Sequence, residues 1–157
     1  MIHVVRHAHA GSRRQWNGDD WRRPLSSRGQ MEAERLAEFF AAGESLTELL
    51  SSPYLRCVQT LEPVAAALGL EITVADWLAE GTAPERVFDG LRDLAPSAAL
   101  CSHGDVIGDL IGHLAARGLP MRGPLRWAKA SVWHLEVTGG RIRSASYAEP
   151  AGMSTLT

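Results

Sequence analysis

The chain has 157 residues, of which 45% are hydrophobic and 22% charged, and its 16 basic side chains nearly balance 18 acidic ones. This size predicts one domain, residues 1–157, with a substantial core. The near-zero net charge excludes a general electrostatic attraction to nucleic-acid polymers or membranes. No apolar stretch reaches the roughly 20 residues of a membrane span, and Cys57 and Cys101 are too few for a disulfide scaffold. We therefore expect a soluble, cytoplasmic protein with reduced thiols.

Strands and helices alternate along the first half of the chain. Ser26 is suited to cap a helix whose apolar positions recur at helical spacing up to Gly43, and a second helix ends at Gly69. Segment 8–25 lacks periodicity, and a loop of this length in a small domain indicates a functional role. The expected elements are a strand at 2–5, the loop at 8–25, a helix from 26 to 43, a strand at 46–51, a helix ending at 69 and a strand at 71–74.

The second half continues the alternation and ends in a hairpin. Pro84 suits the first turn of a helix, and Gly139-Gly140 separate two strand-like runs, which predicts a β-hairpin. The expected elements are a loop at 77–82, a helix at 84–94, a strand at 98–101, a helix ending at 118, a connection at 119–130, strands at 131–137 and 141–147, and a frayed tail after 150. This order predicts an α/β fold: a three-layer αβα sandwich with a mostly parallel central sheet, helices on both faces and a C-terminal hairpin.

Two short sequence motifs that follow predicted strands contain the candidate catalytic residues. Arg6-His7 follows the strand at 2–5, and Ser102-His103-Gly104 follows the strand at 98–101. The carboxyl ends of parallel strands border one crevice, where ligands bind. Arg56 lies in the first turn of a predicted helix, and helix N-termini favour anions. Because guanidinium groups donate paired hydrogen bonds to phosphate oxygens, these residues predict a phosphate pocket.

The two histidines have complementary roles in such a pocket. A neutral imidazole is a competent nucleophile towards phosphorus, so one of His7 and His103 would attack while the other stabilises charge on the phosphoryl oxygens. The attacking ring must donate from its other nitrogen to a backbone carbonyl or a carboxylate. Glu80, in a loop after a strand, is the candidate general acid, with its pKa raised beside a dianion. Asp105 competes for this role but is better placed to cap a helix.

Four sequence motifs in a fixed order are the basis of a resemblance to a known family. The sequence resembles the histidine phosphatase superfamily, with the phosphoglycerate-mutase-like fold, and its length is similar to that of the short phosphohistidine-phosphatase type. The resemblance extends over almost the whole chain, and Ala8 stands where the family has glycine. The matching motifs are Arg6-His7-Ala8, Leu25-Ser26-Ser27-Arg28-Gly29, Ser52-Pro53-Tyr54-Leu55-Arg56-Cys57-Val58-Gln59-Thr60 and Ser102-His103-Gly104.

The resemblance implies a cofactor-independent, metal-independent phosphatase that acts on a phosphorylated substrate. It implies that His7 is the nucleophile and that Arg6, Arg56 and His103 complete the phosphate pocket. The short chain favours phosphohistidine on a protein, because it leaves the pocket accessible. The Arg- and Trp-bearing loop favours a nucleotide or another small phosphorylated metabolite. A non-catalytic phosphate-recognition module, a pseudophosphatase, is the alternative from a different functional class.

Two further residues of the loop are candidate substrate contacts. His9 follows the nucleophile at alternate spacing, and Arg13 is one of several arginines in the loop. His7 and His9 also form a His-x-His pair, which is typical of some metal sites, but no further cluster of ligands accompanies it in the sequence. We therefore expect His9 and Arg13 to meet the substrate and expect no metal. The sequence carries no signal for an oligomeric state.

Overall fold

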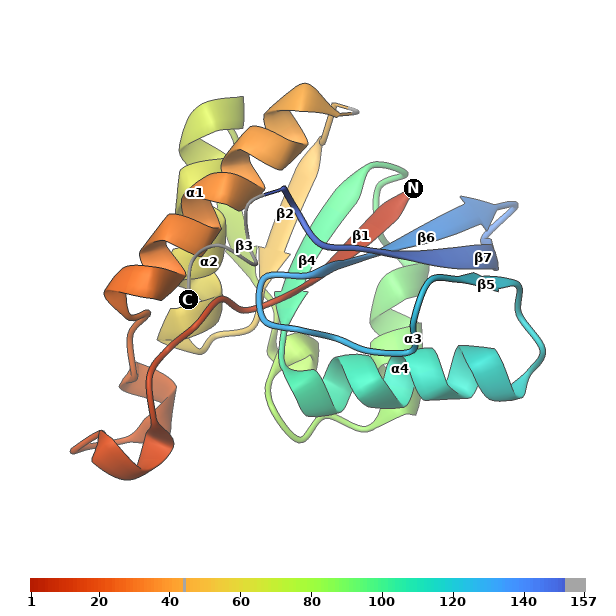
Figure 1. Ribbon diagram of the computed structural model, residues 1–157. Coiled ribbons are helices and arrows are strands. Elements are labelled where there is room, and N and C mark those ends of the chain that lie inside the picture. The colour runs from red at the N-terminus through yellow and green to blue at the C-terminus, as the bar shows by residue number, and fades with distance from the viewer. Residues whose placement is uncertain (44, 152–157) are drawn as a thin grey trace.

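The computed structural model of the chain describes residues 1–43 and 45–151. Within that part of the chain, one seven-stranded sheet lies between two pairs of helices (Figure 1). The strands are β1 (Ile2–Arg6), β2 (Glu48–Ser51), β3 (Ile72–Val74), β4 (Ala98–Ser102), β5 (Met121–Arg122), β6 (Val132–Thr138) and β7 (Arg141–Ala148). The helices are α1 (Ser27–Ala42), α2 (Leu55–Leu68), α3 (Pro84–Arg92) and α4 (Gly104–Ala116).

The sheet order is β3-β2-β4-β1-β6-β7-β5. Strands β3, β2, β4 and β1 are mutually parallel, β6 runs antiparallel to β1 and to β7, and β5 is parallel to β7. The predicted α/β class, the mostly parallel sheet and the C-terminal hairpin are therefore confirmed. The pairing places the ends of β1 and β4 side by side, because Arg6 is in register with Ser102.

Alternation along the central strands divides the core into two layers. Val4 and Leu100 face α3 and α4, whereas their neighbours Val5 and Cys101 face α1 and α2. Successive side chains of a strand point to opposite faces, so one strand supplies both layers. Figure 1 shows α1 and α2 on one side of the sheet and α3 and α4 on the other, as the three-layer prediction requires.

Three connections differ from their expected form. Loop 8–25 contains two short 3₁₀ helices, Arg13–Gln15 and Asp20–Arg22, and a third, Asp76–Leu78, begins just before the expected loop at 77–82. The connection at 119–130 contains β5, whose two residues are too few to show an alternating pattern. Most of the tail for which we predicted fraying, residues 152–157, lies outside the described residues.

The entry to α1 agrees with the sequence. Ser26 is the N-cap, and its Oγ accepts a hydrogen bond from the Gly29 backbone N–H at 3.1 Å. Gly29 is required by packing as well, because a Cβ there would lie 1.9 Å from the His9 carbonyl oxygen. Loop and helix are therefore in direct backbone contact. None of the helices within 1–43 and 45–151 combines the length and the apolar character that crossing a membrane would need.

Candidate active site

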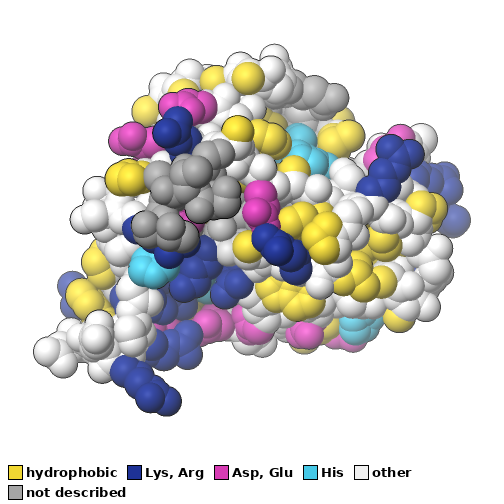
Figure 2. Space-filling view, in the orientation of Figure 1, with side chains coloured by type: hydrophobic (Ala, Val, Ile, Leu, Met, Phe, Trp, Pro, Cys, Tyr) yellow, Lys and Arg dark blue, Asp and Glu magenta, His cyan; other side chains and the backbone are white. Residues whose placement is uncertain are grey.

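A cavity of about 730 Å³ opens where β1 and β4 end. This volume lies in the range of sites that hold small molecules. Figure 2 shows Lys and Arg side chains gathered on this part of the surface. The basic wall residues are Arg6, Arg13, Arg23, Arg56 and Lys129, and the acidic ones are Glu80, Asp105 and Asp109. His7 lies on the wall among them.

Arg6 is the last residue of β1, and its guanidinium lies over the start of α4. Its Nη1 donates to the Trp127 carbonyl oxygen at 2.7 Å. A Cβ on Gly104 would lie 3.0 Å from Arg6 Cζ, so glycine at this position lets the guanidinium approach the helix. Burial lowers the pKa of Arg6, but a guanidinium stays charged under all relevant conditions.

His7 is buried directly after β1, and its ring is held in one tautomer. Its Nδ1 lies 2.8 Å from the Ala8 carbonyl oxygen. A carbonyl only accepts hydrogen bonds, so this contact assigns the proton to Nδ1 and leaves the lone pair on Nε2. The His7 backbone N–H donates to the Ser102 carbonyl at 3.0 Å, which ties the end of β1 to the end of β4. This is the arrangement that a nucleophilic imidazole requires.

The surroundings of His7 keep its ring neutral. Burial, followed by electrostatic interactions with His103, Arg56 and Arg6, lowers the pKa of His7 well below 6.5, and the bond to Ala8 only partly opposes this shift. A protonated imidazole has no lone pair with which to attack. The same cations that attract an anion therefore also hold His7 in its reactive form at neutral pH.

His103 lies behind His7, with the two ring centroids 5.5 Å apart. Its Nε2 is 2.8 Å from Ser52 Oγ, and that oxygen already accepts from the Tyr54 backbone N–H at 3.3 Å. The Ser52 hydroxyl can donate to Nε2, and the proton of the neutral ring then lies on Nδ1. The Tyr54 ring, 4.6 Å away between centroids, fixes the orientation of the imidazole.

Arg56 is fully buried in the first turn of α2 and is oriented by acidic groups. Its Nη1 donates to the Asp20 backbone carbonyl at 2.9 Å, and its Nη2 donates to Asp20 Oδ2 at 3.1 Å. Nη2 also contacts Glu80 Oε1 at 3.5 Å. The guanidinium lies over the Tyr54 ring at 4.8 Å. The tip of Arg56 is thereby fixed towards the cavity that His7 faces.

Other side chains of the sequence motif at 52–60 connect separate segments of the chain. Thr60 Oγ1 accepts from the Ala8 backbone N–H at 3.0 Å and donates to the Arg56 carbonyl at 2.6 Å. Gln59 Oε1 accepts from the Leu25 backbone N–H at 2.8 Å. Because these bonds join α2 to the end of β1 and to the end of loop 8–25, they position the site without touching the cavity.

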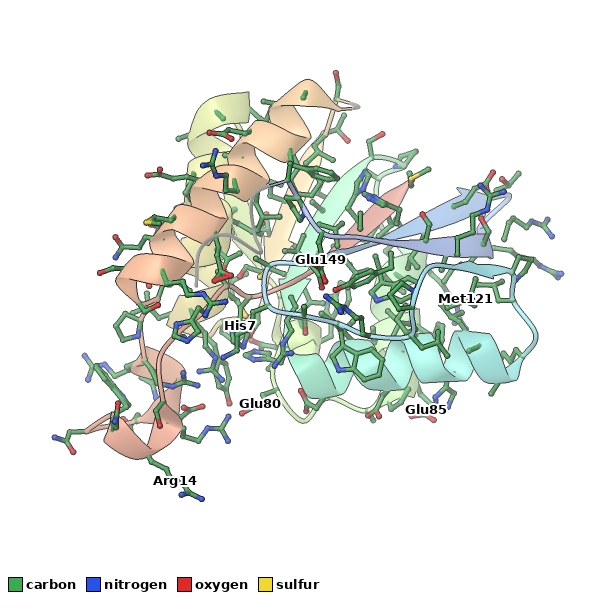
Figure 3. The ribbon with its side chains drawn as sticks, viewed as in Figure 1. His7, Arg14, Glu80, Glu85, Met121 and Glu149 are labelled. Atoms are coloured by element: carbon green, nitrogen blue, oxygen red, sulfur yellow. The ribbon has the colours of Figure 1, made fainter. Side chains whose placement is uncertain are left out.

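Glu80 lies on the cavity wall, on the side from which loop 8–25 projects. Figure 3 shows Glu80 below His7, whereas Arg14 points away at the outer end of that loop. Glu80 Oε1 accepts from Arg13 Nη2 at 2.9 Å. The Asp105 carboxylate accepts from the Gly81 backbone N–H at 2.8 Å. The prediction that Asp105 caps its own helix is wrong, because it instead holds the loop that carries Glu80.

Two residues that follow His7 point away from the cavity. His9 does not line the cavity; its Nδ1 lies 2.6 Å from Ser26 Oγ, and its backbone N–H donates to the buried carboxylate of Glu32 at 2.9 Å. Ala8 is fully buried among the side chains of α1 and α2, so its methyl group fills core space. Over residues 1–43 and 45–151, no group of three or more His, Cys, Asp or Glu side chains is arranged to hold a metal.

Sequence reasoning missed several residues that shape the site. Asp20 binds three arginines, with Arg23 Nε at 3.1 Å and Arg13 Nε at 3.4 Å in addition to Arg56. Burial alone would raise the pKa of Asp20, but the bond to Arg23 and the neighbouring cations lower it overall. The mixed charges of loop 8–25 were the only signal of this cluster. Lys129 is the single lysine of the chain, but nothing in the sequence places it on the cavity wall.

Comparisons of sequence and of fold relate the chain to known proteins. Residues 2–85 match the histidine phosphatase superfamily (branch 1). The chain is 32% identical over 154 residues to an 8-oxo-(d)GTP phosphatase of Mycolicibacterium smegmatis; the match covers 94% of this chain and 47% of the relative. The chain thus spans about half the length of this curated relative.

Solved structures with the same fold include the protein histidine phosphatase SixA complexed with tungstate, with a TM-score of 0.76, 22% identity and 99% of both chains covered. A mycobacterial glucosyl-3-phosphoglycerate phosphatase superposes with a TM-score of 0.65 at 16% identity, covering 94% of this chain and 95% of the other. At these identities the likeness concerns the fold alone.

Proposed function

The chain belongs to the histidine phosphatase superfamily, and from this premise we propose that it is a metal-independent phosphatase whose His7 forms a covalent phosphohistidine intermediate. The proposal assigns Arg6, Arg56 and His103 to the phosphoryl group and Glu80 to the leaving group. All the cationic groups that it needs come from the chain itself.

One observation carries the proposal. Within residues 1–43 and 45–151, the buried side-chain polar atoms without a hydrogen-bond partner are the nitrogens Arg6 Nε, Arg56 Nε and His103 Nδ1. Buried polar groups are normally hydrogen-bonded, and an unpaired one costs about 1–3 kcal/mol. All three belong to residues that surround His7. A tetrahedral anion with several acceptor oxygens satisfies such a set, which supports a phosphoryl group as the ligand.

The first chemical step transfers the phosphoryl group to the enzyme. His7 Nε2 attacks phosphorus, and the new N–P bond forms as the bond from phosphorus to the leaving oxygen breaks. The leaving oxygen takes a proton from Glu80. An incoming dianion competes for the Arg13 and Arg56 N–H groups that Glu80 binds in the free protein. Once released from these ion pairs, the Glu80 carboxyl group can face the leaving oxygen, and the proton that it donates comes from solvent.

The second step returns the enzyme to its starting form. Water attacks phosphorus while the Glu80 carboxylate accepts its proton. The N–P bond breaks, inorganic phosphate leaves, and the electron pair of that bond returns to His7 Nε2. The bond from His7 Nδ1 to the Ala8 carbonyl keeps the ring in place throughout. Protons and charge therefore balance over the two steps without a metal or a cofactor.

A small phosphorylated molecule, and a nucleotide in particular, is the substrate class with the most support. The relative that is 32% identical is named for 8-oxo-(d)GTP, and the cavity is large enough for more than a phosphoryl group. Phosphohistidine on a protein is the second candidate. It is supported by the likeness of the fold to SixA, which is named a protein histidine phosphatase.

Trapping of the intermediate tests the mechanism. The purified chain is incubated with p-nitrophenyl phosphate and a chelator, turnover is measured, and acid-labile phosphate on the protein is quantified after rapid quenching. We expect chelator-resistant turnover and labelling, both abolished in His7→Ala. The control His113→Ala removes an exposed histidine of α4 and should retain both. Phosphate binding without turnover or label in the wild type, with guanosine diphosphate as well as with p-nitrophenyl phosphate, would instead identify a pseudophosphatase.

A further inference from the structure

The cations of the cavity fall into two groups. Arg13, Arg23 and Arg56 all contact the Asp20 carboxylate, so much of their charge is already balanced. Arg6 and Lys129 form no ion pair with any carboxylate of residues 1–43 and 45–151. Asp105 and Glu32 act on Arg6 and Lys129 only electrostatically, without an ion pair, so these two cations are less firmly bound by carboxylates than the other three. Of these two cations, Lys129 has no role in either of the proposed chemical steps.

The backbone fixes Lys129 beside the nucleophile. The next residue, Ala130, donates its N–H to the carbonyls of Arg6 at 3.1 Å and His7 at 3.3 Å. Ala130 is fully buried and has a φ of 61°, a left-handed conformation that is uncommon for a residue with a side chain. Strain of this kind persists only where the surrounding contacts enforce it, and it concentrates at ligand sites. Two bonds and a strained residue thus hold Lys129 on the cavity wall.

The ammonium group of Lys129 lies in a positive environment. The side chain is half-buried on the cavity wall. Burial and the positive charges of Arg6 and Arg23 lower the pKa of Lys129, and the negative charge of Glu32 only partly opposes this shift. An ammonium that is partly removed from water among like charges is unfavourable in the free protein. An anion arriving beside it would remove that cost, so the position favours binding of negative charge.

We propose that Lys129 binds a second anionic group of the substrate, next to the phosphoryl group that His7 attacks. The substrate class is then a phosphoanhydride, such as a nucleoside diphosphate or triphosphate, rather than a simple monoester. This inference rests on the proposed phosphatase function and refines its substrate. A single phosphoryl group is fully provided for by Arg6, Arg56 and His103, and the cavity of about 730 Å³ leaves room for a second one.

Steady-state kinetics with guanosine diphosphate and guanosine monophosphate test the subsite, because the two substrates differ only in the second phosphate. We expect the wild type to prefer the diphosphate. Lys129→Met should lower the ratio of the two kcat/KM values about tenfold to a hundredfold, chiefly through KM for the diphosphate. Lys129→Arg should restore much of the preference. Arg143→Met removes an exposed cation of β7 and should leave the ratio unchanged. An unchanged ratio in Lys129→Met would overturn the proposal.

A binding measurement separates the subsite from the chemistry. Inorganic pyrophosphate and inorganic phosphate are titrated calorimetrically into His7→Ala, with and without Lys129→Met. We expect pyrophosphate to bind more tightly than phosphate and the preference to disappear with Lys129. If this holds while the wild type shows no turnover, the phosphatase proposal fails and the subsite stands. If pyrophosphate has no Lys129-dependent advantage, the subsite is refuted, whatever the kinetics of the monoester show.

Discussion

Asp20→Asn is the substitution that most directly examines how the site is held together. Asp20 joins the projecting loop to the buried guanidinium of Arg56, whose side chain is only 1% exposed, and to Arg23, which is 8% exposed. Its own side chain is 29% exposed, so solvent only partly screens these interactions. Asparagine has nearly the same shape but removes the negative charge. The change therefore isolates electrostatics from packing.

The magnitude follows from the two buried partners. A hydrogen bond to a charged group contributes about 1.5–3 kcal/mol. Asparagine keeps one acceptor oxygen, and the bond from Arg56 to the Asp20 backbone carbonyl survives. We therefore expect a loss of about 2 kcal/mol in the free energy of unfolding, which lowers Tm by roughly 4–8 °C for a chain of this size. A less firmly oriented Arg56 should lower kcat/KM for an aryl phosphate by about tenfold or more.

Thermal unfolding followed by circular dichroism and steady-state kinetics measure the two effects. Asp19→Asn is the matched control, because it removes the same charge from the adjacent, exposed residue and should change neither quantity. The pKa of Asp20 lies below its ordinary 3.8 in the folded protein, so its contribution is present above that pH and is lost as pH falls through the folded value. Equal Tm and kcat/KM in the two variants would refute the positioning role of Asp20.

Three further changes probe separate parts of the structure. Gly104→Ala places a Cβ 3.0 Å from the Arg6 guanidinium, so kcat/KM should fall about tenfold while Tm, in a helix that tolerates alanine, stays equal or rises. Thr60→Val leaves the Ala8 N–H without its acceptor and should lower the free energy of unfolding by about 2 kcal/mol in urea titrations; no change would show that another group takes over the bond. Burial lowers the pKa of His3 to about 4 in the folded protein. The unfolded chain therefore binds a proton between pH 6.5 and 4 that the native protein does not bind, and the free energy of unfolding should fall by about 3 kcal/mol over this range. His3→Gln should remove most of this slope, and an identical pH dependence in the variant would contradict the assignment.

Local signals in the sequence explain why most of the fold was predictable. Ser26 as a cap, glycine at the ends of helices and the Gly139-Gly140 turn act over a few residues, and the structure confirms the helices and the hairpin that they predicted. β5 escaped prediction because its two residues owe their conformation to pairing with β7 rather than to any pattern of their own. The 3₁₀ helix Asp20–Arg22 escaped for a similar reason, since Arg56, 34 residues or more away along the chain, holds it through hydrogen bonds.

The residues of the proposed phosphate pocket could be selected from the sequence, because strand ends in an α/β sheet converge on one edge. Arg6 and His7 therefore had to approach His103, and the register of β1 with β4 brings them together. Only the tertiary structure revealed how these groups are oriented: the tautomer of His7 depends on a carbonyl, and that of His103 depends on Ser52.

The sequence by itself determined the class of fold, the order of its elements and the set of side chains proposed to bind a phosphoryl group, since each depends on short-range pattern. The tertiary structure alone decided the charge balance within the cavity. Asp20 is bound to three arginines and Lys129 to no carboxylate of the described residues, although both are simply charged residues in the sequence. Electrostatic interactions fall off with distance and grow with burial, so their strength is defined only once the folded chain has set both.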